Sequence, residues 1–524
     1  FSTGTAHRFA DGMYISQFNG YGDWNFGQRA FSSSAPNNHK ALCTANLPVS
    51  TLPDGSNHFD ILTWDGLGSG SRSFTGLSFQ PDLTWVKIRT QSYTHTIYDS
   101  VRGAGSGKEL QSDSTNGEGQ ANTDQYGYLS SFNSDGFSST AGSSDNDYFN
   151  KSGNSYVAWN WNAGANSNKT YSVKVVNDGG NNKYRFDDSS VSGYILELAE
   201  GSTYTFDCSD SSCDSHPFLI GSGSSVLSSG VVYTLDGVTK TFNQYTSGFA
   251  AATTRKLTLT IPASAPAYCY YCHVHSGMGA TINTNATAGS SNLDGTEGAV
   301  VKANQAAGFS IITLNFGSVS GTISVGHGLN AAPHFWIMKD RDSADAWYVG
   351  HISIGAGYYL RFGRTSSGTE SLSSKIASTT LWDNTLPSNS LIYSNGTAMD
   401  GAGDYLMLAW APVEGYSSFG SYVGNGLSNG PFVSTSFKVG FLMVKSHSAS
   451  GAWRTYDSKR KTFNTINNSL HWDTNEDETV YSNDEIDFYS NGFKPKATGS
   501  FHNGSGVEYI YAAFAENPFQ ANGG

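Results

Sequence analysis

The residues best suited to do chemistry lie in one short stretch of the sequence. Cys272, His275 and Met278 form a Cys-x-x-His-x-x-Met motif, which offers a thiolate, an imidazole and a thioether. His216 lies well upstream, before a Pro-Phe pair at the expected end of a strand, and would add a second imidazole. One thiolate, two imidazoles and a weak axial thioether are the ligand set of copper electron-transfer sites. The spacing therefore predicts a copper site formed by these four residues.

Three further cysteines leave a second interpretation of this segment open. Cys208 could pair with Cys213, or Cys269 could pair with one of them. If Cys272 were itself oxidised into such a bond, no thiolate would remain for copper. The sequence thus allows either a copper-competent site or a scaffold whose loop is locked by disulfides. His273 would point away from Cys272 if the strand continues there, so we expect it at the surface.

Strands are needed to bring the two halves of the motif together. Strand-like runs fall at 171–176, 194–198, 203–206 and 257–261. With both halves of the site in place, residues 165–283 resemble the cupredoxin family of type-1 copper proteins. The resemblance implies a Greek-key β-sandwich in which the four residues above bind copper. Such a filled centre leaves no open coordination position for a substrate, so we expect no copper enzyme.

The composition of the whole chain predicts short strands joined by turns. Only 14% of the 524 residues are charged, whereas Gly occurs 60 times and aromatic residues reach 13%. Aromatic and β-branched residues favour strands, and Gly favours the turns between them. The net charge of -13 argues against nucleic acid or an anionic membrane as a partner, since both attract basic patches. No apolar run of about 18 residues occurs, so we expect no membrane insertion.

Internal repeats organise most of the chain. A short apolar run closed by Lys recurs at 83–87, 335–339 and 441–445. Aromatic-rich runs follow at 156–161, 405–410 and 509–514. A Tyr-Asp-Ser-x-Arg stretch at 98–102 is similar to 456–460 but has no counterpart in the middle copy. We expect buried strands that reach the surface at each Lys, and central strands at the aromatic runs; aromatic pairs lining a ligand groove are the alternative.

These patterns predict an all-β protein with several β-sandwich domains in series, one of them a cupredoxin-like Greek-key sandwich. The repeats occupy 57–164, 307–414 and 415–524, and the cupredoxin-like domain occupies 165–283. Residues 284–306 are rich in small and polar residues and are expected to be a linker. Residues 1–56 are too short for a domain, and we expect them to end a sheet whose other strands lie upstream or in a partner chain.

Parts of the sequence also resemble a specific class of proteins. Residues 25–31 (NFGQRAF) with 40–48 (KALCTANLP) look like the C-terminal end of a SPRY-like, concanavalin-type domain. That element occurs in tail-fibre and virion structural proteins of marine tailed phages, followed by similar repeats and inserts. The matching stretches in this chain are 99–103, 204–217, 271–279, 413–416, 419–422 and 511–519.

The resemblance implies a structural and adhesive subunit of a phage tail fibre or virion appendage, located in the virion or outside the cell. Its implied partners are further copies of the chain, other virion or filament subunits, and a host-surface glycan or protein. An extracellular filament or surface adhesin of a cell is the alternative, and a copper-binding electron-transfer protein is a further one.

We expect no enzyme activity and no catalytic residues. The sequence contains neither a Gly-x-Ser-x-Gly nor a His-Glu-x-x-His motif, which would indicate a serine or a metal hydrolase. Carboxylates cluster at 145–147 and at 473–478, where Ca²⁺ binding or acid–base chemistry is conceivable. We expect both clusters to be solvated loops.

Overall fold

The computed structural model describes residues 7–8, 14–15 and 52–516, apart from 69, 121–122, 166–167, 188, 224, 317–320, 364–372, 396–401 and 481–483. The chain divides into two units, one made of Phe1–Ser50 with Phe519–Gly524 and the other of Thr51–Pro518. In the first unit, the described residues are the paired strands β1 (His7–Arg8) and β2 (Tyr14–Ile15). The predicted SPRY-like sheet end over 1–56 therefore lies almost entirely outside the described residues.

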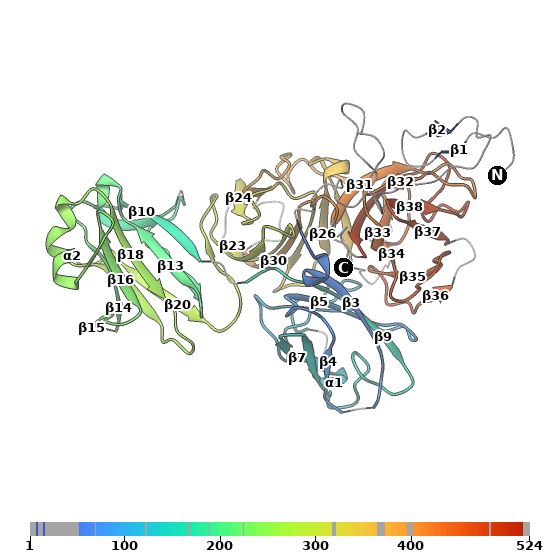
Figure 1. The fold of residues 1–524 in the computed structure, drawn as a ribbon, viewed down its shortest axis with the longest axis horizontal. Helices are drawn as coiled ribbons and strands as arrows, with labels where there is room; N and C mark the ends of the chain where they lie inside the picture. Colours follow the sequence, from blue (N-terminus) through green and yellow to red (C-terminus); the bar gives the residue numbers. More distant parts are fainter. Residues whose placement is uncertain are drawn as a thin grey trace, which may run out of the picture. The chain divides into compact units, whose positions relative to one another are not determined.

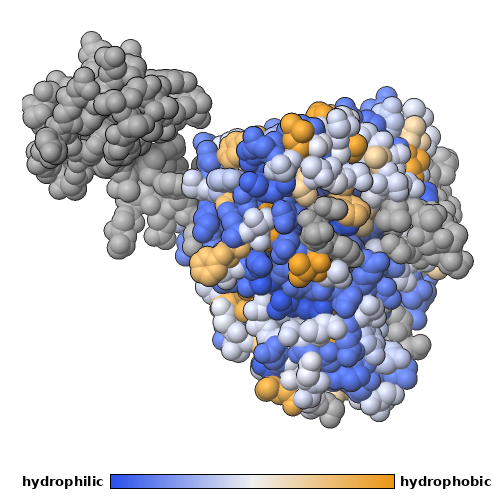
Figure 2. Space-filling view, turned by 90° about the vertical axis from the view of Figure 1, so that its right-hand side faces the viewer, coloured by the Kyte–Doolittle hydropathy of each residue, from blue (hydrophilic) through white to orange (hydrophobic). Residues whose placement is uncertain are grey.

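The described part of the second unit is built almost entirely of strands in several separate sheets, which confirms the all-β prediction (Figure 1). The α-helices described there, α1 (Thr123–Tyr126) and α2 (Phe242–Gly248), are short. No helix among these residues has the length and apolar character needed to cross a membrane. The face drawn in Figure 2 is mostly hydrophilic, with apolar residues in small separate groups.

The three repeats share one strand order. In the first repeat the larger sheet has the order β3-β9-β5-β6 and the smaller sheet β4-β8-β7. Its strands are β3 (Phe59–Asp65), β4 (Arg72–Thr75), β5 (Leu83–Ile88), β6 (Thr96–Asp99), β7 (Tyr128–Asn133), β8 (Gly136–Thr140) and β9 (Ser155–Trp161). The last strand of the repeat thus lies between the first and second strands of the larger sheet.

The second repeat contains the same order as β23-β30-β25-β26, extended by β27 and β28, with β24 and β29 as its small sheet. Its strands are β23 (Phe309–Phe316), β24 (Thr322–Gly326), β25 (Phe335–Asp340), β26 (Trp347–His351), β27 (Tyr358–Phe362), β28 (Ile376–Ala377), β29 (Leu391–Asn395) and β30 (Gly403–Trp410).

The third repeat contains the order again as β31-β39-β33-β34, extended by β35 and β36, with β32-β38-β37 as its small sheet. Its strands are β31 (Ser417–Val423), β32 (Val433–Ser434), β33 (Val439–Ser446), β34 (Arg454–Asp457), β35 (Asn468–His471), β36 (Thr479–Val480), β37 (Ile486–Tyr489), β38 (Gly492–Pro495) and β39 (Glu508–Ala515).

One hydrophobic cluster contains core residues from all three repeats. Trp161, Trp410 and Phe514 occupy equivalent positions on β9, β30 and β39. The Trp161 ring lies 6.0 Å from that of Trp410 and 5.8 Å from that of Phe514, centroid to centroid. The repeats follow one another along the chain as predicted, but their larger sheets bury a common core because each offers one aromatic face.

Hydrogen bonds at equivalent positions close a ring between the repeats. Trp85 Nε1 donates to His95 Nδ1, so His95 Nε2 carries the proton and donates to a carbonyl of the third repeat. The Trp347 and Trp453 indoles, four residues before the ends of β26 and β34, make the matching bonds. The three bonds are His95 to His471 O (2.8 Å), Trp347 to Gln111 O (2.9 Å) and Trp453 to Arg361 O (2.9 Å).

The lysine that closes each apolar run is buried, so the expectation that it reaches the surface was wrong. Lys87, Lys339 and Lys445 are each 0% exposed. Their ammonium groups donate to backbone carbonyls just after their own strands, such as Ile88 O at 2.7 Å and Asp340 O at 2.6 Å. Burial lowers the pKa of Lys87 and of Lys445 to about 8. A buried cation of this kind ties a loop to its strand by satisfying carbonyls that would otherwise lack donors.

Two arginine–glutamate networks also join the repeats. Glu118 of the first repeat accepts from Arg341 of the second at 2.5 Å and lies 3.3 Å from Arg102. Glu478 of the third repeat accepts from Arg89 of the first at 2.6 and 3.1 Å. The arginines of the two Tyr-Asp-Ser-x-Arg stretches, Arg102 and Arg460, lie 3.3 Å from Glu118 and Glu478 and so belong to these networks. The stretch therefore has a structural role in the first and third repeats.

We expect acid to weaken these networks. Burial opposes ionisation of Glu118 and Glu478, but the arginines outweigh it and lower the pKa of each carboxyl from 4.5 to about 2. A depressed carboxyl pKa stabilises the fold above the unfolded value, and the gain is lost as pH falls from about 4.5 to about 2. Glu478→Gln should lower the free energy of unfolding at neutral pH and remove on the order of 3 kcal/mol of its acid dependence.

Urea unfolding at a series of pH values measures this effect. Glu414→Gln is the matched control, because Glu414 is exposed and outside both networks. An acid dependence of Glu478→Gln equal to that of the unmodified protein would contradict the prediction.

The predicted linker over 284–306 is in fact part of a sheet. β21 (Ser290–Asn292) and β22 (Ala299–Asn304) pair with each other, and β22 pairs with β23 of the second repeat. The linker prediction was wrong because small residues dominate the composition, whereas Ala299 and Val301 are buried with the alternation of a strand. The large sheet of the second repeat thus begins before residue 307.

The insert between the first and second repeats forms two sheets around a cluster of its own. Their orders are β11-β10-β13-β18-β16-β17 and β12-β20-β19-β14-β15. The strands are β10 (Lys169–Asp178), β11 (Asn181–Phe186), β12 (Leu196–Ala199), β13 (Thr203–Asp207), β14 (Phe218–Ser222), β15 (Ser225–Val226), β16 (Val231–Leu235), β17 (Val238–Lys240), β18 (Arg255–Thr260), β19 (Tyr268–Cys272) and β20 (Ala280–Asn285). Parallel pairing of β10 with β13 and of β12 with β20 gives the crossed connections of a mixed sandwich.

Candidate metal centre

Two neighbouring strands of the insert bring the halves of the Cys/His motif together. β14 pairs antiparallel with β19, and Phe218 lies opposite Cys272 in that register. His216 precedes β14, so it reaches the loop that follows Cys272. The backbone N–H of His273 donates to Pro217 O at 2.9 Å, which fixes the start of that loop against the segment that carries His216.

The side chains of His216, Cys272 and His275 converge. Their ligand atoms all lie within 4.8 Å of one another. Cys272 Sγ is 3.8 Å from His216 Nδ1 and 3.5 Å from His275 Nδ1. The centroids of the two imidazole rings are 4.5 Å apart, with an interplanar angle of 45°. Both rings direct Nδ1 toward Cys272 Sγ. This is the trio predicted from the sequence, and among the described residues it is the group of metal-ligating side chains that converges in this way.

The site is sheltered on one side and open on the other. Cys272 and Met278 are 5% and 2% exposed, whereas His275 is exposed. His216 is also buried, and burial, followed by the nearby His275, lowers the pKa of its imidazole. A neutral imidazole is the form that binds a metal ion. Met278 packs in the hydrophobic cluster of the insert at the end of the same loop.

Tyr184 of β11 supports the site, although the sequence did not single it out. Its hydroxyl donates to the backbone carbonyl of His216 at 2.8 Å. Burial, and then the proximity of Cys272, raises the pKa of this phenol. Tyr184 thus lies close to both halves of the motif. A tyrosine in an alternating strand carries no sequence signal for this role, because it depends on how β11 packs against β14.

The four described cysteines are free thiols, so the structure does not contain the disulfides predicted as an alternative for Cys208, Cys213 and Cys269. Cys208 and Cys213 are buried, and burial raises the pKa of both thiols, that of Cys213 to about 12. Cys269 Sγ faces Gly221 O at 3.6 Å, on the strand face opposite to Cys272. The thiol of Cys272 is therefore available to a metal ion. His273 is exposed, as expected.

The donor set fits copper. Thiolate, two imidazoles and a thioether together favour copper over zinc, whose structural sites use cysteine and histidine without methionine. Three of these residues already converge, and Met278 lies in the same loop as Cys272 and His275.

The carboxylate clusters are structural, and the expectation of solvated loops was wrong for their buried members. Asp473 is 0% exposed and accepts from the backbone N–H of Trp453 at 3.0 Å. Asp147 is 0% exposed and pairs with Lys151 at 2.5 Å. Asp473 thus ties its loop to the segment before β34, and Asp147 pairs within its own loop.

Comparison with known proteins matches the repeats and the two ends of the insert, but not the part of the insert that holds the candidate ligands. A family described as a domain of unknown function, DUF7483, matches residues 54–186 and 280–518. The matched ranges cover most of the chain and all three repeats, whereas the residues between them contain His216, Cys272, His275 and Met278. No curated protein and no solved structure matches the chain. By the extent of the match over its three repeats, the chain belongs to the DUF7483 family.

Proposed function

We propose that the protein binds one copper ion at Cys272, His216, His275 and Met278, and that its repeats form the rigid scaffold that carries this centre. The convergence of Cys272 Sγ with the two Nδ1 atoms, at 3.8 and 3.5 Å, is the observation that carries the proposal. Copper bound by such a set would exchange single electrons between Cu(II) and Cu(I). The exposed His275 gives that exchange a route to solvent, while the four ligands leave no position for a substrate.

Titration of the whole chain with Cu(II) tests this function. We expect one equivalent to bind and to produce an intense visible thiolate-to-copper absorption that disappears on reduction. Protein that stays colourless and free of copper after titration would refute the proposal.

Tyr184→Phe should weaken copper binding without abolishing it. The Tyr184 hydroxyl holds the backbone carbonyl of His216, so its loss should loosen the segment that carries one imidazole ligand. Loss of an outer partner of this kind costs roughly 10–100-fold in metal affinity. A competition titration measures the affinity, and the visible spectrum shows whether copper stays bound to the thiolate.

Tyr171→Phe is the matched control for Tyr184→Phe. Tyr171 is another tyrosine of the insert whose hydroxyl donates to a backbone carbonyl at 2.8 Å, but its partner is Ser291 of β21, away from the metal ligands. Equal losses of copper affinity in the two variants would show that Tyr184 acts only through stability.

A structural and adhesive role is the second function we propose. The shared core and the ring of bonds between the repeats support it, because they make three modules into one stiff body. The chain would act as a subunit of a phage tail fibre or virion appendage, assembled with copies of itself and with other virion subunits. A filament or surface adhesin of a cell is the alternative. Mass spectrometry and electron microscopy of purified particles test this role, and absence of the chain from virions would rule out the first setting.

A further inference from the structure

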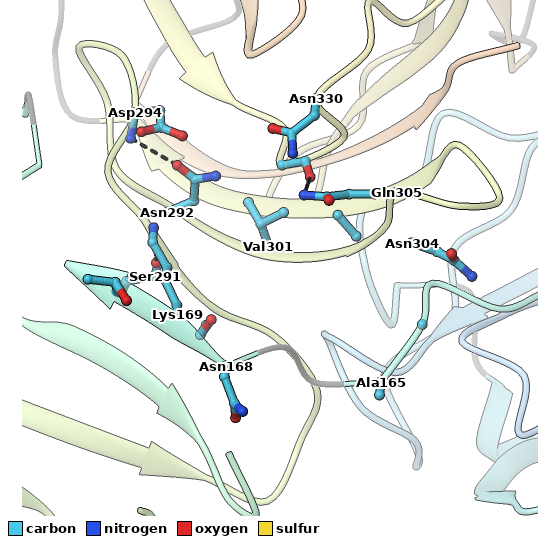
Figure 3. A pocket seen from close by; sticks show the side chains of 15 residues that line it. Ala165, Asn168, Lys169, Ser291, Asn292, Asp294, Val301, Asn304, Gln305 and Asn330 are labelled. Carbon is cyan, nitrogen blue, oxygen red and sulfur yellow. Dashed lines mark hydrogen bonds between the residues drawn. The ribbon is translucent and has the colours of Figure 1, made fainter. Parts of the chain in front are cut away.

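A polar pocket lies where the insert meets the sheet of the second repeat. Its volume is about 520 Å³, within the size range of small-ligand sites. One wall comes from the start of β10, and the other comes from β21, β22 and the loop after β24. Figure 3 shows Asn168 and Lys169 on the strand of the insert, with Gln305 and Asn330 on the opposite side of the pocket. The family match includes both walls, but no function is assigned to them.

Side-chain amides dominate the lining. The polar side chains that could reach a ligand belong to Asn168, Asn292, Gln305, Asn330 and Asp294. Val301 and Ala303 supply a small apolar floor between them. A lining with this many neutral donors and acceptors is suited to a ligand that has hydroxyl groups on several sides.

Several of these amides are held by one hydrogen bond and keep their other polar atom for a ligand. Asn292 Oδ1 accepts from the Asp294 N–H at 2.9 Å, and Asn168 Oδ1 accepts from the Thr203 N–H at 3.0 Å. Gln305 Nε2 donates to Gly328 O at 3.0 Å. No hydrogen bond from Asn292 Nδ2 to another described residue accompanies the one that its Oδ1 accepts, so the amide N–H groups of Asn292 are available to a ligand.

The charges of the pocket exclude an anion. Lys169 Nζ is already engaged, because it donates to Ser291 O at 3.0 Å, lies 3.5 Å from Asp187 and sits 4.6 Å over the Tyr171 ring. Asp294 adds a second carboxylate near Lys169, beside that of Asp187. The local charge is thus negative, which disfavours phosphates and acidic sugars. The amide oxygens of Asn168 and Asn292 already accept backbone hydrogen bonds, so few free oxygen ligands remain for a divalent cation.

We propose that this pocket binds a neutral glycan. Asp294 would accept hydrogen bonds from two adjacent sugar hydroxyls, Asn292 would donate to a third, and Val301 would contact the C–H face of the ring. A neutral glycan would be the ligand recognised in the adhesive role proposed above, and this inference rests on that role. Binding in solution tests the pocket, whereas particle composition tests the role, so the two can fail separately.

Saturation-transfer NMR and titration of the whole chain test the pocket with neutral mono- and disaccharides of glucose, galactose, mannose and N-acetylglucosamine. We expect at least one sugar to bind. Asp294→Asn and Asn292→Asp should each weaken binding of that sugar by about tenfold or more, since the first removes a charged acceptor and the second replaces an N–H donor by a carboxylate. Both changes preserve side-chain shape, and an unchanged unfolding midpoint and copper stoichiometry show that the fold is intact.

Asn243→Asp is the control, because it makes the same exchange at an exposed position of α2. Three results would overturn the proposal: no sugar of the panel binds, phosphate or an acidic sugar binds instead, or Asp294→Asn binds as well as the unmodified protein.

Discussion

Cys272→Ser should abolish the visible absorption of the copper-loaded protein and most of its copper affinity. The reason is that the thiolate supplies both the charge-transfer transition and the softest donor of the set. The loss of affinity should exceed the roughly 10–100-fold cost of removing an outer partner of a metal site. Atomic absorption after dialysis gives the stoichiometry, and the visible spectrum reports the thiolate bond directly.

Cys269→Ser provides the control in the same strand. Cys269 is three residues away on β19 and points to Gly221 rather than to the histidines. It should bind one equivalent of copper with the spectrum of the unmodified protein. If Cys269→Ser lost the absorption and Cys272→Ser kept it, the ligand assignment would be wrong.

Trp161→Ala should destabilise all three repeats together. Its ring packs within 6.4 Å of rings from each repeat, which are Phe59, Phe309, Trp410, Phe441 and Phe514. Truncation of a buried tryptophan costs about 3–5 kcal/mol through lost burial and the cavity that remains. Because the cavity opens at the shared core, every larger sheet loses contacts at once. Urea unfolding with limited proteolysis measures both the loss and the segments that become cleavable.

Trp382→Ala is the control that distinguishes a core shared by all three repeats from a core within a single repeat. Trp382 is 1% exposed but packs in the cluster of the second repeat alone, with Trp336 at 5.5 Å. It should lose comparable stability while the first and third repeats stay protected from protease. Independent domains would instead give local cleavage for Trp161→Ala as well, confined to the first repeat.

The candidate copper site was largely predictable because its information is local. Cys272, His275 and Met278 come from one loop, and His216 stands beside a Pro-Phe pair that opens a strand. The strand pairing that joins them, with Phe218 opposite Cys272, follows from alternation and turns that are visible in the sequence. Tyr184 was missed since its contact with the motif depends on packing between sheets.

The repeats were predictable because their patterns are also local in the sequence. The core that the three repeats share was not predictable. Runs such as 83–87 and 441–445 identify strands because residues two apart share a face, whatever lies across from that face. The buried lysines show the limit of such patterns: a charge at the end of an apolar run indicates a surface, unless a loop folds back to supply carbonyls, as Ile88 and Gln91 do for Lys87.

Composition and spacing along the chain thus predicted an all-β protein, the three repeats, the insert and the four residues of the candidate metal centre. Only the three-dimensional packing showed that the repeats share a core, that 290–292 and 299–304 form strands, and that the four described cysteines are free thiols. Periodicity determines which face of a strand is apolar, whereas the partner of that face is selected by contacts between residues hundreds of positions apart. Those contacts leave no mark in any short stretch of sequence.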